Sequence, residues 1–173
     1  MIFTIMKRCF FVAAILAAAL VGCKKEEVKP VFYTVEVEFS TNDDTRAVAD
    51  MSVNYIVNES GTMNSEVMTS NTWTKSINYA YDPFTWKFSA SAVERTSART
   101  QDKYVLGYEF HYRVFVTMSN LDKIEIYNSI EDATWMTTPR EDVSETISHA
   151  DKFLPSVEET FAFQPSTETF TIK

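Results

Sequence analysis

The amino-acid sequence predicts a mainly β protein that folds as a single antiparallel β-sandwich with one short helix near the C-terminal third. Apolar residues recur at every second position over most of the chain after residue 30, which is the pattern of half-buried strands. Turn-forming residues interrupt these runs at short intervals, as they do in sandwiches and barrels. Aromatic residues suited to a β core are abundant, with 13 Phe, 8 Tyr and 3 Trp against 3 Gly.

The strands expected in the first half are separated by polar segments. The sequence from Asn58 to Gly61 is the clearest turn, because Asn and Gly tolerate positive φ angles. Residues 40–46 and 91–103 are polar, and we expect the first to be a loop and the second a long loop or the end of a hairpin. The strands expected before and between these polar segments cover residues 31–39, 51–57, 62–69, 73–79 and 84–90.

The strongest strand signal covers residues 104–118, where apolar and aromatic residues occupy every second position. Gly107 lies inside this long strand and marks the place where we expect a bend or bulge. After a turn at residues 120–122, residues 123–128 are expected to return with Ile124 and Ile126 pointing inward. Residues 130–136 are predicted to form a loop.

The last third begins with helix signals. Thr138 can act as an N-cap, Pro139 stands at the first helical position, and Glu141 follows three residues after the cap. Apolar residues then recur at helical spacing, which predicts an amphipathic helix over residues 139–153. The apolar residues are Val143, Ile147, Ala150 and Leu154. Strands at residues 157–163 and 167–172 complete a sandwich of seven to nine strands.

The N-terminus has the features of a targeting segment. Lys7 and Arg8 precede an uncharged apolar run at residues 10–20, which is shorter than the roughly 20 residues that a transmembrane helix needs. The run leads into Leu20-Val21-Gly22-Cys23, which resembles the lipobox of bacterial lipoproteins. In that family a peptidase cuts before the Cys, which then receives a diacylglycerol and usually a third acyl chain such as palmitate. An ordinary secretory signal that happens to end in Cys is the alternative.

The resemblance implies three parts: a lipoprotein signal peptide at residues 1–22, an acylated tether at 23–30, and the β-sandwich domain at 31–173. Two acyl chains anchor a protein stably where one is marginal, so the partner implied for Cys23 is outer-membrane lipid. Residues 24–27, Lys-Lys-Glu-Glu, lack the Asp that marks inner-membrane retention and resemble a surface-export tag of Gram-negative lipoproteins. We expect an outer-membrane, lipid-anchored protein, at the cell surface rather than on the periplasmic face, unless these charges are only a solvated linker.

Charge and composition exclude several partners. The whole chain has a formal charge of −8, and since residues 1–22 carry only Lys7 and Arg8, the remainder carries −10. Such a domain repels nucleic acid, so no nucleic-acid partner is expected. The low glycine content argues against phosphate-binding loops, and no cofactor is predicted. With Cys9 removed and Cys23 acylated, no disulfide is expected.

Few residues suggest catalysis, and the chain is not expected to be an enzyme. The only histidines are His111 and His149, no Cys of the mature chain is free to pair with them, and no Gly-x-Ser-x-Gly motif occurs. No spacing typical of a metal site is present, so no metal ligand is predicted. Residues 42–44, Asn-Asp-Asp, could supply oxygen ligands to Ca²⁺ but fit a polar turn better. A hydrolase with carboxylates from distant strands is the least favoured alternative.

The tryptophans are the best candidates for ligand binding, since their large rings offer surfaces on which a sugar can stack. They are Trp135, Trp86 and Trp73. Core packing explains Trp73 and Trp86 better, because both stand in strand register with other apolar residues. Trp135 belongs to the loop expected at residues 130–136, where binding and packing explain it equally well.

Tyr55, Asn58, Gly61, Trp73 and Lys75 form a pattern similar to that of small Ig-like β-sandwich lipoproteins, including the MmpS-like accessory group. The likeness covers residues 31–128, and the helix expected at 139–153 departs from it. It implies an Ig-like fold and an accessory or binding role without catalytic residues. We therefore expect a non-enzymatic binding or interaction module for a glycan, a peptide or an envelope protein. The alternative is a structural or assembly subunit that pairs through edge strands.

Overall fold

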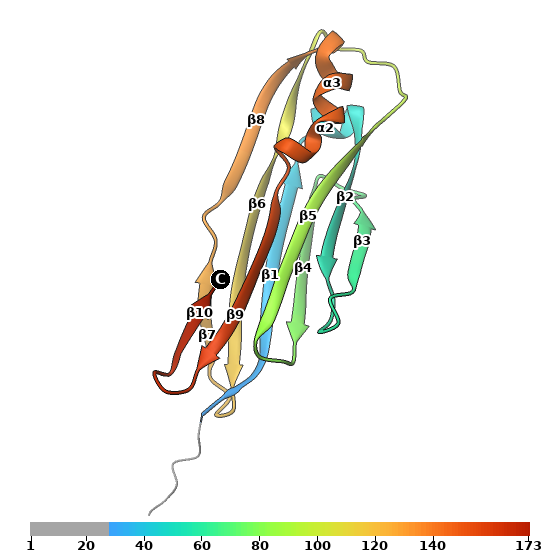
Figure 1. The fold of residues 1–173 in the computed structure, drawn as a ribbon. Helices are drawn as coiled ribbons and strands as arrows, with labels where there is room; N and C mark the ends of the chain where they lie inside the picture. The colour runs from blue at the N-terminus through green and yellow to red at the C-terminus, as the bar shows by residue number, and fades with distance from the viewer. Residues whose placement is uncertain (1–27) are drawn as a thin grey trace, which may run out of the picture.

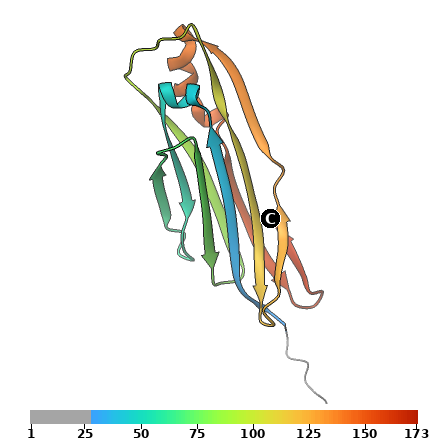
Figure 2. The ribbon, with the colours of Figure 1, turned by 180° about the vertical axis from the view of Figure 1, so that it is seen from behind.

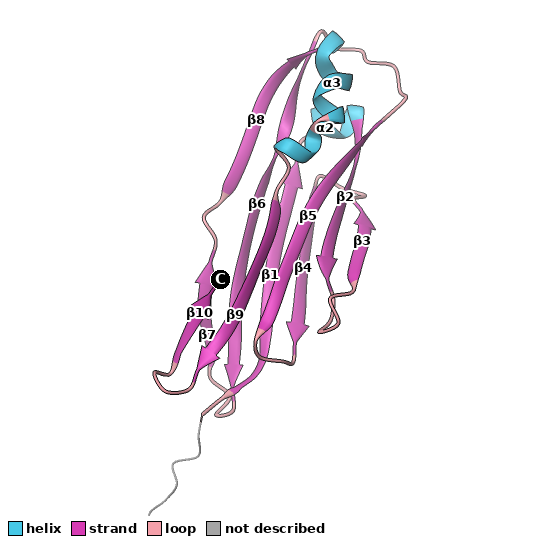
Figure 3. Ribbon diagram, in the orientation of Figure 1, coloured by secondary structure: helices cyan, strands magenta, loops and turns pink. Residues whose placement is uncertain are grey.

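The computed structural model of the protein describes residues 28–173, and it confirms the predicted β-sandwich. Two antiparallel five-stranded sheets, A and B, face one another along the length of an elongated molecule (Figure 1). The helices gather at one end of the sandwich (Figure 3). The described chain enters at the opposite end, at the start of β1 (Figure 1).

Sheet A is built on the long central strand β6. β1 lies along one edge of β6 and carries β4 on its far side, whereas β7 and β8 follow one another along the other edge of β6. Figure 2 shows this arrangement from behind. The strands of sheet A are β4 (Thr72–Tyr79), β1 (Pro30–Thr41), β6 (Lys103–Met118), β7 (Lys123–Asn128) and β8 (Asp132–Pro139).

Sheet B has the strand order β10-β9-β5-β2-β3, and all neighbours are antiparallel. Its strands are β10 (Thr169–Ile172), β9 (Ser156–Gln164), β5 (Phe84–Glu94), β2 (Ala49–Ile56) and β3 (Met63–Val67). The ten strands exceed the seven to nine expected, because β8 lies where residues 130–136 were predicted to form a loop.

The core lies between the sheets and is largely aromatic. Phe39 of β1 pairs with Phe110 of β6, and both rings contact Phe88 of β5 across the sheet interface. The Phe88 and Phe110 rings are stacked with centroids 4.5 Å apart, a spacing at which aromatic pairs add stability beyond the area they bury. The alternation of apolar residues seen in the sequence therefore corresponds to the inward faces of both sheets.

The polar segment at residues 40–46 is not the loop that the sequence predicts. β1 continues to Thr41, and Asp43–Val48 forms the short helix α2, whose first turn is capped by the Asn42 side chain through Thr45 N at 2.9 Å. Six residues are too few to show a helical period in the sequence. The one sequence feature that indicates this helix is Asn42, a residue type favoured at the N-cap.

α2 also replaces a strand beside β6. The pairing of β1 with β6 ends at Thr41, which leaves the backbone of Val105 without a strand partner on that side. Asn42 Nδ2 donates to Val105 O at 2.7 Å, and Val105 N donates to Asp44 Oδ2 at 2.8 Å. The Asn-Asp-Asp segment thus satisfies backbone groups that a polar turn would leave unpaired.

The predicted helix at residues 139–153 is shorter and less regular than expected. α3 covers only Val143–Ser148 and lies between two 3₁₀ turns, Arg140–Asp142 and Ala150–Lys152. Thr138 provides no cap, because it belongs to β8 and is buried there. The apolar face is as predicted, since all four of its members are buried against the end of the sandwich: Val143, Ile147, Ala150 and Leu154.

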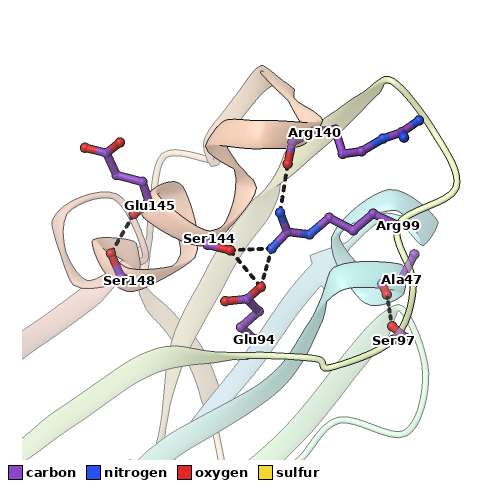
Figure 4. Close-up of polar contacts among 8 residues, drawn as sticks. All are labelled: Ala47, Glu94, Ser97, Arg99, Arg140, Ser144, Glu145 and Ser148. Atoms are coloured by element: carbon purple, nitrogen blue, oxygen red, sulfur yellow. Dashed lines mark hydrogen bonds and ion pairs between the residues drawn. The ribbon is translucent and has the colours of Figure 1, made fainter.

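The loop at residues 95–102 is fastened to this helical end. β5 extends to Glu94, so the loop is shorter than the segment 91–103 that the sequence predicts. Arg99 donates to the backbone oxygen of Arg140 at 2.8 Å, and also to Ser144 and to the carboxylate of Glu94 (Figure 4). The guanidinium therefore ties the loop to β5 and to the start of α3.

Candidate functional site

The three tryptophans that the sequence singles out lie in different environments. Trp86 in β5 is fully buried in the core, and Trp73 in β4 is half-buried at the side of the sandwich. Trp135 lies in strand β8 rather than in a loop, is 41% exposed and faces away from the core. The structure does not bring the three indoles onto one surface.

Trp135 covers a glycine on the neighbouring strand. Gly107 of β6 pairs directly with Trp135, and a Cβ placed on Gly107 would lie 2.7 Å from the indole and 1.9 Å from the backbone oxygen of Thr134. The indole thus lies close over Gly107, where no other side chain fits. Packing against this backbone gives Trp135 a structural role in addition to its exposed ring face.

Trp73 belongs to a polar cluster that connects the two sheets. Glu66 of β3 accepts hydrogen bonds from Trp73 Nε1 and from Lys75 Nζ, both at 2.8 Å. It also accepts one from Tyr55 OH, which in turn accepts a bond from Asn64. Trp73 and Lys75 come from sheet A and the other members from sheet B, so the cluster closes one side of the sandwich.

The protonation of Glu66 follows from this cluster. The hydrogen bond from Lys75 is the largest effect, followed by those from Trp73 and Tyr55, and together they lower the pKa of Glu66 to about 2. Glu66 is therefore ionised at neutral pH and has no proton to donate in catalysis. Its role in the fold is to hold two sheet edges together.

A second carboxylate has the same role on the opposite side. Tyr112 OH of β6 donates to Glu159 Oε2 of β9 at 2.5 Å, and Tyr127 OH of β7 donates to Glu159 Oε1 at 3.4 Å. Burial, followed by the hydrogen bond to Glu159, raises the pKa of Tyr112 far above its ordinary value. Tyr112 therefore remains a neutral donor at every physiological pH.

The outer face of sheet A carries two adjoining hollows of about 330 Å³ and 300 Å³, which we call the sheet A groove. The hollows share Glu38 of β1 and His111 of β6, which are opposite one another in the sheet. The groove crosses the strands from β4 to the β7–β8 junction. Its other polar lining residues are Glu36, Ser40, Thr74, Lys75, Ser76, Glu109, Arg113, Ser129 and Glu131.

The two ends of the sheet A groove differ in charge. At the first end Glu36 accepts from Arg113 at 2.9 Å and from Lys123 at 3.4 Å, so opposite charges neutralise one another. At the second end the carboxylates are Glu38, Glu109 and Glu131, and within residues 28–173 none of these three forms a salt bridge. The second end can therefore accept a cationic group.

His111 joins the two ends. Its Nε2 lies 2.7 Å from Asn128 Oδ1, which holds the ring in the groove beside Glu38. The other histidine, His149, is exposed at the end of α3, where its Nδ1 lies 3.0 Å from the backbone oxygen of Glu145. The two histidines do not meet. Among residues 28–173, Ser148 is the only residue with a nucleophilic side chain that hydrogen-bonds to either of them, and it lies beside His149.

The side-chain oxygen atoms of residues 42–44, which could bind Ca²⁺, already accept hydrogen bonds from other groups of the domain. Asn42 Oδ1 accepts from the backbone of α2, Asp43 accepts from Asn71 at 2.6 Å, and Asp44 accepts from Gln101 and from the backbone of Val105. In the part of the chain from residue 28 onward, no group of three or more His, Cys, Asp or Glu is placed to hold a metal ion.

The predicted lipidation site, Cys23, lies outside the residues that the structure describes. Among residues 28–173, no helix is long and apolar enough to span a bilayer. No protein-family model, no curated protein and no solved structure shows a significant match to this chain.

Proposed function

We propose that this protein is a lipoprotein of the outer membrane, anchored through Cys23, and that its domain is a non-enzymatic binding module. The sequence Leu20-Val21-Gly22-Cys23 supports the anchor. The second end of the sheet A groove supports binding, because three carboxylates line a hollow there and none of them forms a salt bridge within residues 28–173.

The ligand proposed for the groove is a positively charged peptide segment of another envelope protein. Carboxylates that form no salt bridge within the described residues attract Lys and Arg side chains, and charge complementarity of this kind increases association rate and specificity. A glycan needs accessible aromatic rings, and the outer face of sheet A offers few. Trp135 is partly exposed, whereas the Phe115 ring is covered by Lys123 Nζ at 4.2 Å and by the Arg113 guanidinium at 5.4 Å.

The binding proposal is tested with a fluorescent oligolysine peptide as the probe. We expect the triple variant Glu38→Gln, Glu109→Gln, Glu131→Gln to lose binding, while binding to the unchanged protein weakens steeply with salt. The matched control replaces three exposed glutamates outside the groove, Glu59, Glu141 and Glu168, by Gln, which removes the same charge.

Equal loss in the two triple variants would mean that net charge rather than the groove binds the peptide, and would contradict the proposal. Retention of binding in the first variant would contradict it as well. Binding of a neutral oligosaccharide that depends on Trp135 would support the glycan hypothesis instead.

A second candidate function, assembly through an edge strand, rests on β8. Its outer edge has no strand partner within residues 28–173, and the run from Ala133 to Thr138 carries no charge that would repel a second strand. Sedimentation of the mature protein tests this function. Deleting residues 167–173, which contain β10, tests the edge that β10 forms in sheet B, and a shortened chain that stays folded and still associates would exclude strand exchange there.

A further inference from the structure

Exposed apolar side chains gather where the described chain enters the domain. They are Val28 and Val31 at the start of the described residues and Leu121 and Ile124 at the β6–β7 hairpin, with exposed fractions of 37%, 50%, 83% and 45%. The inward position that the sequence predicts for Ile124 is therefore wrong. We call these four residues the entry tip. Single exposed apolar side chains are common on protein surfaces, whereas these four lie on two neighbouring segments at one end of an acidic domain.

Backbone hydrogen bonds hold the two parts of the entry tip together. Ser119 N donates to Lys29 O at 2.8 Å, and Lys29 N donates to Ser119 Oγ at 3.2 Å. Leu121 N donates to Met118 O at 2.8 Å, which closes the hairpin. Figures 1 and 2 show the start of β1 and this hairpin side by side at the same end of the molecule, opposite the helices.

Fold stability does not account for a leucine at position 121. Its φ of 71° lies in the left-handed region, which favours Gly or Asn and costs other residues energy. Its side chain is also the most exposed in the entry tip, so burial in the core offers no compensation. An apolar side chain placed at such a cost gains when an apolar phase outside the protein removes it from water.

The proposed acyl anchor at Cys23 places the apolar interior of a lipid bilayer close to Leu121. Cys23 precedes Val28 by five residues, which span at most about 18 Å when fully extended. An acylated Cys23 therefore keeps the entry tip close to the headgroup region that borders the hydrocarbon core of the bilayer. No residue of the opposite end, where the loop 95–102 and α3 lie, can come as near without turning the domain over (Figure 1).

We infer that the entry tip rests in the interface of the lipid bilayer and inserts Leu121, so that the domain stands with its helical end away from the membrane. The inference rests on the acylation of Cys23 in the proposed function. The contact is apolar rather than electrostatic, because the mature chain carries a formal charge of −10 and anionic lipid would repel it. A zwitterionic bilayer is the partner that fits this chemistry.

Depth-dependent fluorescence quenching in the acylated protein tests the inference. Because Cys9 is removed with the signal and Cys23 is acylated, Leu121→Cys introduces a single free thiol for an environment-sensitive fluorophore. The matched control is Thr100→Cys, an exposed position in the loop 95–102. The labelled proteins are reconstituted into phosphatidylcholine vesicles, with and without a lipid that carries a quencher near its headgroup.

We expect a blue shift and loss of emission at position 121 and neither at position 100. Flotation with the vesicles but no quenching at position 121 would overturn the inference and leave the anchor intact. Equal quenching at both positions would overturn it too, since the domain would then lie flat. Failure of the unlabelled protein to float would overturn the anchor at Cys23 and the inference with it.

Discussion

The indole of Trp73 and the carboxylate of Glu66 join the edges of two different sheets, with Trp73 Nε1 donating to Glu66 Oε2 at 2.8 Å. β4 is an outer strand of sheet A and β3 is an outer strand of sheet B, so no backbone hydrogen bond connects them. The side chains supply the link that backbone pairing cannot provide at the open side of a sandwich. Removing the carboxylate should therefore loosen this side of the domain.

Replacing Glu66 by Gln is expected to destabilise the domain by about 1–2 kcal/mol. A hydrogen bond to a charged group contributes about 1.5–3 kcal/mol, and the contribution is reduced here because the Glu66 side chain is 32% exposed and partly screened by water. Urea unfolding at pH 7 measures the change. The control Glu158→Gln removes an ion pair with Lys87 that is more exposed and lies within one sheet, so its cost should stay below about 0.5 kcal/mol.

The cost of Glu66→Gln should depend on pH in a defined direction. Glu66 has a folded pKa of about 2, below its ordinary value of 4.5, so the carboxylate stabilises the fold fully above about pH 4.5. That contribution is lost as the pH falls from 4.5 towards 2. The difference in unfolding free energy between the two proteins should therefore shrink between about pH 5 and about pH 2.5, and a difference that stays constant would contradict this role of Glu66.

Gly107→Ala is expected to cost about 3 kcal/mol, because the new Cβ would lie 1.9 Å from the backbone oxygen of Thr134 and β6 and β8 would have to separate. Gly61→Ala provides the matched control. Gly61 has a φ of 73° but no atom within 4 Å of the place that a Cβ would occupy, so only backbone strain of about 1 kcal/mol is expected. Equal effects of the two changes on the unfolding midpoint would show that β8 can yield at this position.

The strands were predictable where one face of the sheet is apolar and the other is polar. The alternation in residues 104–118 predicted β6 correctly, and the Asn58–Gly61 turn is closed by Gly61 N donating to Asn58 O at 3.1 Å. β8 was missed because its largest apolar side chain, Trp135, lies on the outward face. The sequence there lacks the usual alternation of apolar inward and polar outward residues. The helix at residues 139–153 was predicted too long because its i, i+4 pattern does not reveal that 3₁₀ turns flank α3.

The sheet A groove could be predicted only in part. The alternation places Glu36 and Glu38 on one face of their strand and Glu109 and His111 on one face of theirs. Which strand lies beside which is set by contacts far apart in the sequence, such as the pairing of Glu38 with His111, and a single sequence does not contain this register. The individual faces were therefore visible from the residues, but the groove that they form together was not.

Asn42→Ala is expected to lower stability by about 1–2 kcal/mol. The change removes the cap of α2 and also leaves Val105 O without its donor, at a place where β6 has no strand neighbour on the side of β1. Asp43→Ala is the control, because among the described residues the Asp43 side chain bonds only to Asn71 at the exposed surface, and a cost of about 0.5 kcal/mol is expected. Thermal unfolding followed by circular dichroism compares the two, and a larger effect for Asp43→Ala would contradict the role given to Asn42.

Cys23→Ala is expected to abolish attachment to the membrane, because the proposed anchor consists of acyl chains on this one residue and each buried CH₂ contributes about 0.8 kcal/mol to binding. Cells are grown with an alkyne-bearing fatty acid, and the protein is then examined for label and separated into soluble and membrane fractions. Cys9→Ala is the matched control: this cysteine lies within the segment expected to be removed, so the variant should keep both label and membrane attachment. If Cys23→Ala remains labelled in the membrane fraction, acylation occurs elsewhere, and the short spacing between Cys23 and Val28 no longer explains how the entry tip reaches the bilayer.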